Sequence, residues 1–171
     1  TLERVAAEHL VAAADAAAVQ RIVYLGGLMP EHPTSQHLRA RLATGEILRT
    51  ARATVVEVRA GLIVGPGSAA WEVMRDLVNH LPMMVTPRWV RSRSTPIALE
   101  DLLVYQLGFA TVPLEDDEIL EVRGADVLSY QEMMNVYGEL VGRRRPIIPV
   151  PVLTPRLSSY WLWLVTSVPT N

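Results

Sequence analysis

The stretch Arg21-Ile-Val-Tyr-Leu-Gly-Gly27 is a short run of apolar residues that ends at two glycines. A run of this length and composition, bounded by glycine, predicts a buried strand. Before it, from Leu2 to about Ala18, apolar residues recur at spacings of three and four, which predicts an amphipathic helix. The order helix then strand is typical of an α/β sheet.

The remainder of the chain continues this alternation. Thr34 or Ser35 can cap a helix to about Arg52, and Ser129 with Glu132 forms a capping-box signature. We expect further helices over 68–80, 100–107 and 129–140, and strands over 54–59, 94–98 and 118–123. Short loops between these elements predict a parallel sheet that is covered by helices on both of its faces.

The composition narrows the range of functions. With 16 basic and 18 acidic residues the net charge is -2, so no broad positive surface favours nucleic acid. The chain contains no cysteine, and every basic residue is arginine, so thiol and lysine chemistry are excluded within it. The four histidines lack ligand spacing, and we expect no metal site. The longest apolar stretch is too short to span a bilayer, and we expect a cytoplasmic protein.

Four segments in this order resemble the later half of the extended and atypical short-chain dehydrogenase/reductases, including proteins similar to nucleoside-diphosphate-sugar epimerases. They are 21–27 (RIVYLGG), 57–67 (EVRAGLIVGPG), 93–101 (RSTPIALED), and 121–124 (EVRG) with 128–132 (LSYQE). The resemblance implies a Rossmann-like domain that binds NAD or NADP. It also implies that the N-terminal strands, with their glycine-rich phosphate turn, are missing here.

From this resemblance we divide the chain into two regions. Residues 1–112 form the C-terminal half of the Rossmann-like NAD(P)-binding domain. Residues 113–171 form a small substrate-side region that ends in a helix with Tyr160 and Leu164 on one face. Without the phosphate turn we expect cofactor binding by these residues alone to be weak or absent.

The resemblance also indicates where catalysis would occur. In the family, a Ser or Thr ends the strand that matches 22–25, and the next helix carries Tyr-x-x-x-Lys. Here the strand ends in Gly26-Gly27, and the helix lacks both tyrosine and lysine. His37 and Arg41, four residues apart on that helix, are a candidate replacement acid and cation. The alternative is that they are two exposed side chains on a polar face.

The resemblance places ligand contacts at the ends of the strands. We predict cofactor contacts at six positions: Gly26, Gly27, Ala60, Gly61, Leu62 and Ile63. A purely structural turn is the alternative for Gly61 to Ile63. Arg91 and Arg93 match the positions where related enzymes hold an acidic or phosphorylated substrate group. A surface salt bridge is the alternative for both arginines.

Three functions follow as hypotheses. The first is an NAD(P)-binding oxidoreductase or epimerase-like protein that acts on a small molecule, with homo-oligomerisation left open. The second is a non-catalytic, cofactor-responsive binding or assembly protein that retains the fold without the Tyr-Lys pair. The third is a membrane-surface scaffold that uses residues 160–164.

Overall fold

The computed structural model describes residues 2–29 and 36–150. These residues form two compact units. Unit 1 contains residues 2–61 and 100–123, without the undescribed 30–35, and unit 2 contains residues 62–99 and 124–150. Each unit is built from two separate stretches of the chain, so residues 62–99 form an insertion within unit 1.

Unit 1 is a three-stranded parallel sheet with three helices. Its elements are α1 (Leu2–Ala16), β1 (Arg21–Gly27), α2 (Gln36–Leu48), β2 (Thr54–Ala60), α4 (Leu99–Thr111) and β7 (Glu118–Val122). The strand order is β1-β2-β7, and each adjacent pair is parallel. The adjacent, parallel pairing of β1 and β2 confirms the prediction from their apolar runs.

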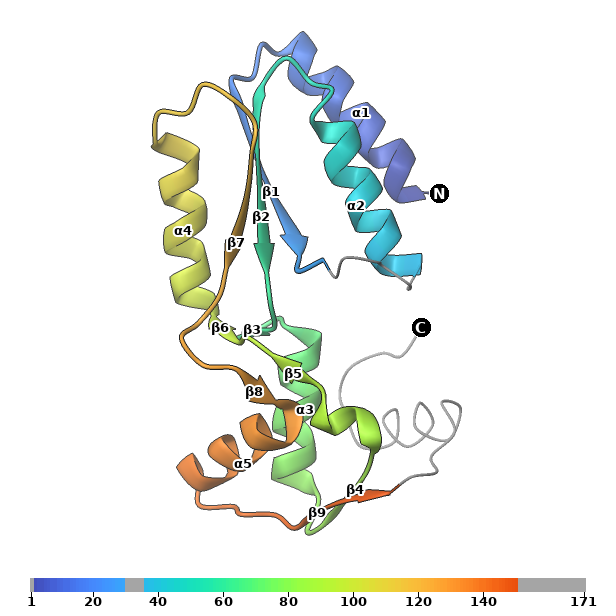
Figure 1. The fold of residues 1–171 in the computed structure, drawn as a ribbon, viewed down its shortest axis with the longest axis vertical. Helices are drawn as coiled ribbons and strands as arrows, with labels where there is room; N and C mark the ends of the chain where they lie inside the picture. The colour runs from blue at the N-terminus through green and yellow to red at the C-terminus, as the bar shows by residue number, and fades with distance from the viewer. Residues whose placement is uncertain (1, 30–35, 151–171) are drawn as a thin grey trace. The chain divides into compact units, whose positions relative to one another are not determined.

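Helices cover both faces of this sheet, as expected. Figure 1 shows α1 and α2 on one face and α4 on the other. Alternate residues of a strand point to opposite faces. Val55 packs with Ala7 and Leu48 on the α1–α2 side, which places Glu57 and Arg59 on that same side of β2.

Two polar contacts join the separate stretches of unit 1. The guanidinium of Arg21, at the start of β1, donates to the carbonyl oxygens of Phe109 (3.1 Å), Leu114 (3.1 Å) and Val112 around the end of α4. The carboxylate of Asp117 accepts from the backbone N–H of Val55 at 2.7 Å. A cation is favourable at a helix C-terminus, where carbonyl groups lack partners.

Unit 2 consists of short elements around an apolar cluster. They are β3 (Ile63–Val64), α3 (Ala69–His80), β4 (Met84–Pro87), η1 (Arg88–Arg91), β5 (Arg93–Ser94), β6 (Ile97–Ala98), β8 (Leu128–Ser129), α5 (Tyr130–Leu140) and β9 (Ile147–Val150). Strands pair as β3-β6 and β4-β9 in parallel and β5-β8 antiparallel. The cluster between them contains four methionines: Met74, Met84, Met133 and Met134.

The N-terminal caps of the two α-helices in unit 2 agree with the sequence patterns. Ser68 caps α3 by accepting from the N–H of Trp71, and Ser129 and Glu132 form the expected capping box of α5. Arg143 and Arg145 donate to the carbonyl oxygens of Asn79 (2.7 Å) and Val78 (3.2 Å) at the end of α3. Two arginines that follow α5 therefore donate hydrogen bonds to carbonyl groups at the end of α3.

The structure differs from the sequence-based expectations in several places. The strand expected over 94–98 is split into β5 and β6, which pair with different strands. Helix α2 ends at Leu48 instead of about Arg52, because the backbone turns tightly and Thr50 donates its hydroxyl to Ile47 O at 2.7 Å. Strand β7, which we assigned to the region 113–171, pairs with β2 in the sheet of unit 1. The compact units therefore have other boundaries than 1–112 and 113–171.

Two expectations lie outside the described residues: the cap at Thr34 or Ser35 and the C-terminal helix with Tyr160 and Leu164. Over the described ranges, no helix is both long enough and apolar enough to cross a membrane. In the same ranges, no group of three or more histidine and acidic residues is placed to hold a metal ion.

Candidate functional site

The carboxyl ends of β1 and β2 bring several predicted cofactor residues to one edge of the sheet of unit 1. Gly26 lies opposite Arg59 and Gly27 opposite Ala60 in the parallel register. The N–H of Leu28 then donates to Ala60 O at 3.1 Å, and Gly61 follows directly. The carboxyl edge of a parallel sheet is where ligands dock in open α/β folds.

Leu62 and Ile63, the other two predicted cofactor residues, belong to unit 2. The side chain of Leu62 lies in the apolar cluster, and its carbonyl accepts from Ile97 N–H at 2.9 Å. Ile63 pairs with Ile97 in the β3-β6 ladder. These contacts give both residues a structural role within unit 2.

A buried carboxylate lies beside Gly26 and was not anticipated. Glu57 is 0% exposed, and its two oxygens bind different arginines: Oε2 pairs with Arg49 Nη1 at 2.5 Å and Oε1 with Arg59 Nε at 2.8 Å. A buried charge needs partners of opposite charge and hydrogen bonds to all its oxygens. Here each oxygen of Glu57 has one guanidinium.

This carboxylate explains two glycines of unit 1. A Cβ at Gly45 would lie 2.5 Å from Glu57 Oε2, and a Cβ at Gly26 would lie 3.3 Å from Oε1. Gly45 thus makes room for the ion cluster inside the fold. Gly27 differs, because a Cβ there would meet no atom within 4 Å. Its backbone is therefore open to close approach.

The two candidate catalytic residues lie on α2, but only one is described in full. Arg41 Nη1 donates to Leu25 O at 3.2 Å, at the end of β1. The side chain of His37 lies outside the described part of the structure. Whether His37 and Arg41 act as a pair therefore stays a prediction.

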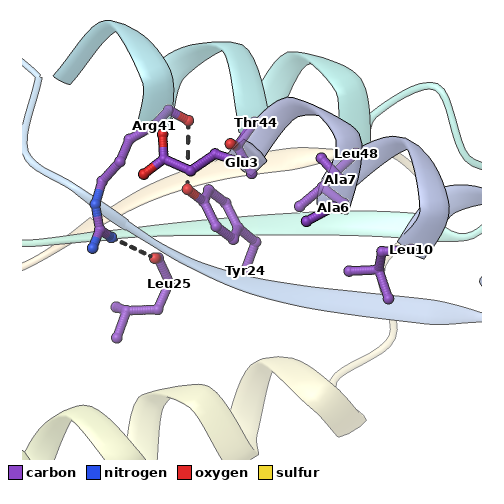
Figure 2. A pocket seen from close by; sticks show the side chains of 9 residues that line it. All are labelled: Glu3, Ala6, Ala7, Leu10, Tyr24, Leu25, Arg41, Thr44 and Leu48. Carbon is purple, nitrogen blue, oxygen red and sulfur yellow. Dashed lines mark hydrogen bonds between the residues drawn. The ribbon is translucent and has the colours of Figure 1, made fainter. Parts of the chain in front are cut away.

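Arg41 also lines a pocket of about 450 Å³ between α1, β1 and α2, which Figure 2 shows from close by. Its walls are mainly apolar, from Ala6, Ala7, Leu10, Leu25 and Leu48, with polar groups from Glu3, Tyr24, Arg41 and Thr44. The Tyr24 hydroxyl donates to the backbone oxygen of Arg41 at 3.4 Å, as the dashed line marks.

The ionisation of Tyr24 argues against its use as a base. Burial raises the pKa of its hydroxyl above the ordinary value of 10.0; the Arg41 cation acts in the opposite direction, and the charge of Glu57 adds to the rise. A tyrosine that serves in proton transfer near neutral pH needs a lowered pKa. Tyr24 therefore remains a neutral hydroxyl at pH 7.

The turn Gly65-Pro66-Gly67, in unit 2, packs closely against its neighbours. Gly67, at φ +82°, donates its N–H to Glu72 Oε1 at 3.0 Å, and Trp71 N–H donates to Ser68 Oγ at 3.4 Å. Gly65 allows close packing, because a Cβ there would lie 2.6 Å from Leu99 Cβ. These contacts give both glycines a structural role within unit 2.

The predicted substrate arginines are both in unit 2. Arg91 ends η1 and is exposed. Arg93 is exposed as well, and its Nη2 donates to Val127 O at 2.7 Å beside the β5-β8 pair. Neither is joined to a described carboxylate by an ion pair within 4.0 Å. Their role in substrate binding stays a prediction.

Sequence reasoning missed Glu57, Arg49 and Arg59. A signal was present: Glu57 and Arg59 occupy alternate positions in an otherwise apolar strand. Alternation places both on one face of the sheet. Charged residues at such positions indicate a buried ion pair when that face is covered by a helix.

No protein-family model and no curated protein sequence matches this chain. Solved structures do match. MoeE5 in complex with UDP-glucuronic acid and NAD superposes with a TM-score of 0.72 at 19% identity, over 86% of this chain and 57% of that one. WbmG of Bordetella bronchiseptica, in complex with NAD and UDP, gives 0.66 at 16% identity, over 96% and 59%.

The UDP-glucose 4-epimerase of Thermus thermophilus, in complex with NAD, gives a TM-score of 0.66 at 16% identity, over 91% of this chain and 62% of that one. The chain thus shares its fold with these three structures over most of its length, in agreement with the fold that the sequence resemblance predicted. It spans less than two thirds of the length of each of these three structures.

Proposed function

We propose that this chain is the substrate-side part of an NAD(P)-binding oxidoreductase or epimerase-like protein that acts on a small molecule. The observation that carries the proposal is the register of β1 and β2, which brings Gly26, Gly27, Ala60 and Gly61 to the carboxyl edge of a parallel sheet. The structures with this fold named above contain NAD, which supports NAD or NADP here.

The residues at this edge fit a flat, polar ring. Gly27 leaves the space beside its backbone open, so the β1 end can approach a ligand closely. A nicotinamide cofactor would supply hydride transfer. Gly26, Gly27, Ala60 and Gly61 would orient its ring through backbone groups. On this proposal Arg91 and Arg93, in unit 2, hold an acidic group of the substrate; the ligands of MoeE5 and WbmG favour a sugar nucleotide.

Titration of the 171-residue chain with NADH and NADPH tests the proposal, with the amide resonances of Gly26, Gly27 and Gly61 as readout. We expect saturable shifts at dissociation constants in the millimolar range, because the sequence contains no G-x-x-G-x-x-G turn whose N–H groups would hold the pyrophosphate. Saturable shifts at other amides with none at these three would overturn the proposed edge. Low-micromolar binding would reveal a phosphate site elsewhere in the chain.

A matched pair of variants makes this test specific. Gly27 and Gly108 both have open space at the Cβ position, but only Gly27 lies at the ligand edge. Gly27→Val should weaken NADH binding about tenfold by blocking the approach to the backbone. Gly108→Val, in the exposed part of α4, should leave the affinity unchanged. Equal effects of the two variants would contradict the proposed edge.

The second candidate is a cofactor-responsive binding or assembly protein without catalysis. It is favoured by α2, which contains neither tyrosine nor lysine, and by the raised pKa of Tyr24. Hydride transfer to NAD from alcohol substrates, measured for the chain and for His37→Ala, separates the candidates. Activity that is lost with His37 while NADH still binds would make His37 the catalyst. Activity that survives His37→Ala would show that another acid acts.

Two further features of the proposal are a cytoplasmic location and a homo-oligomeric assembly. The first follows from the lack of cysteine and from the cofactor class. Size-exclusion chromatography with light scattering of the purified chain measures the second directly.

A further inference from the structure

Arg59 lies at the proposed ligand edge and is only partly engaged by the protein. It is opposite Gly26 in the register of β1 and β2, and its side chain is 15% exposed. Its Nε donates to Glu57 Oε1 at 2.8 Å. Within residues 2–29 and 36–150, no acceptor binds its Nη1 or Nη2.

The cluster of Glu57, Arg49 and Arg59 contains one negative and two positive charges, so its net charge is positive. Glu57 carries a single negative charge, and Arg49 alone, at 2.5 Å, is sufficient to neutralise it. Arginine stays charged at all physiological pH values, so Arg59 adds a positive charge that Glu57 does not balance. Glu121 lies opposite Arg59 in the register of β2 and β7, but the two form no ion pair within 4.0 Å. A largely buried cation with unoccupied donors favours an anionic partner.

The geometry of the guanidinium indicates which partner. Glu57 accepts from Nε and so fixes the orientation of the head group of Arg59. The terminal Nη1 and Nη2 edge remains, and this edge matches the two oxygens of a carboxylate or a phosphate. The position is the carboxyl end of β2, where open α/β sheets bind their ligands.

We propose that the Nη edge of Arg59 binds an oxyanion, a carboxylate or phosphate group of a small-molecule ligand, at the carboxyl ends of β1 and β2. Glu57 is the positioning residue that orients Arg59. This inference deepens the proposed function, because it assigns an anionic group to the ligand of the same sheet edge. It is tested without cofactor, so the two can fail separately.

The experiment is an amide NMR titration of the 171-residue chain with inorganic phosphate and, in parallel, with acetate, at constant ionic strength. We expect saturable shifts at Gly26, Gly27 and Ala60 with dissociation constants in the millimolar range. Phosphate as the tighter probe would assign a phosphate group of the ligand, and acetate as the tighter probe a carboxylate. No saturable shift with either probe overturns the proposal, whatever NADH does.

Variants test Arg59 itself. Arg59→Gln should weaken the tighter probe about tenfold, since a hydrogen bond to a charged group is lost. Arg59→Lys should also weaken it, because lysine keeps the charge but lacks the planar fork. Arg123→Gln is the matched control: it removes an exposed arginine that follows β7 at the same sheet edge. It should leave binding unchanged.

Two outcomes of these variants would overturn the proposal. One is equal loss of binding in Arg59→Gln and Arg123→Gln, which would mean general charge attraction. The other is unchanged binding in Arg59→Lys and Arg59→Gln. If Arg59→Gln fails to fold, the titration of the unaltered chain and of Arg59→Lys still decides. NADH binding without oxyanion binding would leave the proposed function standing and remove only the role of Arg59.

Discussion

Different kinds of interaction stabilise unit 1 and unit 2 internally. Unit 1 has two strands of seven residues in parallel register, with a carboxylate that is 0% exposed and two arginines beneath a helix. Unit 2 has strands of two to four residues around an apolar cluster with four methionines. Backbone pairing and buried charge fix the first, whereas side-chain packing and helix caps fix the second. The two should therefore respond to different substitutions.

The largest effect is expected at Glu57. Glu57→Ala removes the anion and leaves Arg49 and Arg59 without their partner, which should cost about 3–5 kcal/mol in the free energy of unfolding. Urea unfolding measures the total, and amide hydrogen exchange assigns it to a unit. We expect faster exchange in β1 and β2, with the amides of α3 and α5 unchanged.

Glu8→Ala is the control for this prediction. Glu8 pairs with Arg4 at 2.9 Å on the surface of α1, and both side chains are well exposed. Such an exposed pair contributes little to stability, because water and salt screen the attraction between its charges. A Glu57→Ala variant as stable as Glu8→Ala would mean that the buried ion cluster does not hold unit 1 together.

The next effect tests close backbone packing in unit 2. A Cβ at Gly124 would collide with the carbonyl oxygen of Pro96, and Gly124 N–H donates to that same oxygen at 3.1 Å. Gly124→Ala should therefore destabilise the protein by about 2–3 kcal/mol, because two backbone segments must separate. Thermal unfolding of Gly27→Ala, where the Cβ position is open, should show a change within about 0.5 kcal/mol.

A smaller effect is expected at the cap of α5. Ser129→Ala removes the oxygen that accepts from Glu132 N–H at 3.2 Å and should cost about 1 kcal/mol in urea unfolding. Ser129 donates to the Glu132 carboxylate through its backbone N–H and its hydroxyl, and these bonds lower the pKa of Glu132. A cost that exceeds that of Gly124→Ala would contradict our ranking of packing above capping.

The lowered pKa of Glu132 determines the direction in which stability changes with pH. Because the folded value lies below the unfolded one, the stabilisation is present above the unfolded pKa of about 4.3 and is lost as the pH falls through the folded value. Unfolding as a function of pH should thus show a smaller acid loss in Glu132→Gln than in the unaltered chain. An identical acid limb would show that the capping box carries no charge-dependent stability.

The smallest change in stability is expected for Tyr24→Phe. Its pH dependence should be seen at alkaline pH. The folded pKa of Tyr24 is raised, so its contribution is complete below the unfolded pKa of about 10 and is lost as the pH rises through the folded value. Tyr24→Phe should lose under about 1 kcal/mol at pH 7, since the 3.4 Å bond is weak. It should also lose less stability than the unaltered chain as the pH rises above about 10. A steeper alkaline loss in the variant would contradict the burial of this hydroxyl.

What the sequence could predict depended, in both units, on how far apart the contacting residues lie along the chain. The apolar runs of β1, which ends in Gly26-Gly27, and of β2, which Gly61 follows, predicted their parallel pairing and the edge with these glycines. The caps Ser68 and Ser129 were readable because a cap depends on residues within one turn. Both kinds of signal are local in the chain.

The features that were missed depend on contacts between distant segments. β7 joins β2 across a 62-residue separation between Val55 and Asp117, which no local pattern encodes. The two-residue strands of unit 2 have too few residues for a period to appear. The ion cluster of Glu57 also involves Gly45, within α2, and Arg49, which directly follows α2. Only the three-dimensional structure shows that these residues meet Glu57.

The hydrogen bonds between Arg21 and the end of α4 can form only late in the synthesis of the chain. Arg21 and its acceptor Phe109 are 88 residues apart. At about 5–20 residues per second, the ribosome needs roughly 4–18 seconds to translate that interval. During this time β2 and then residues 62–99 of unit 2 are synthesised, before the third strand β7 of the sheet. A nascent chain that stops before residue 109 holds Arg21 with none of its three carbonyl partners.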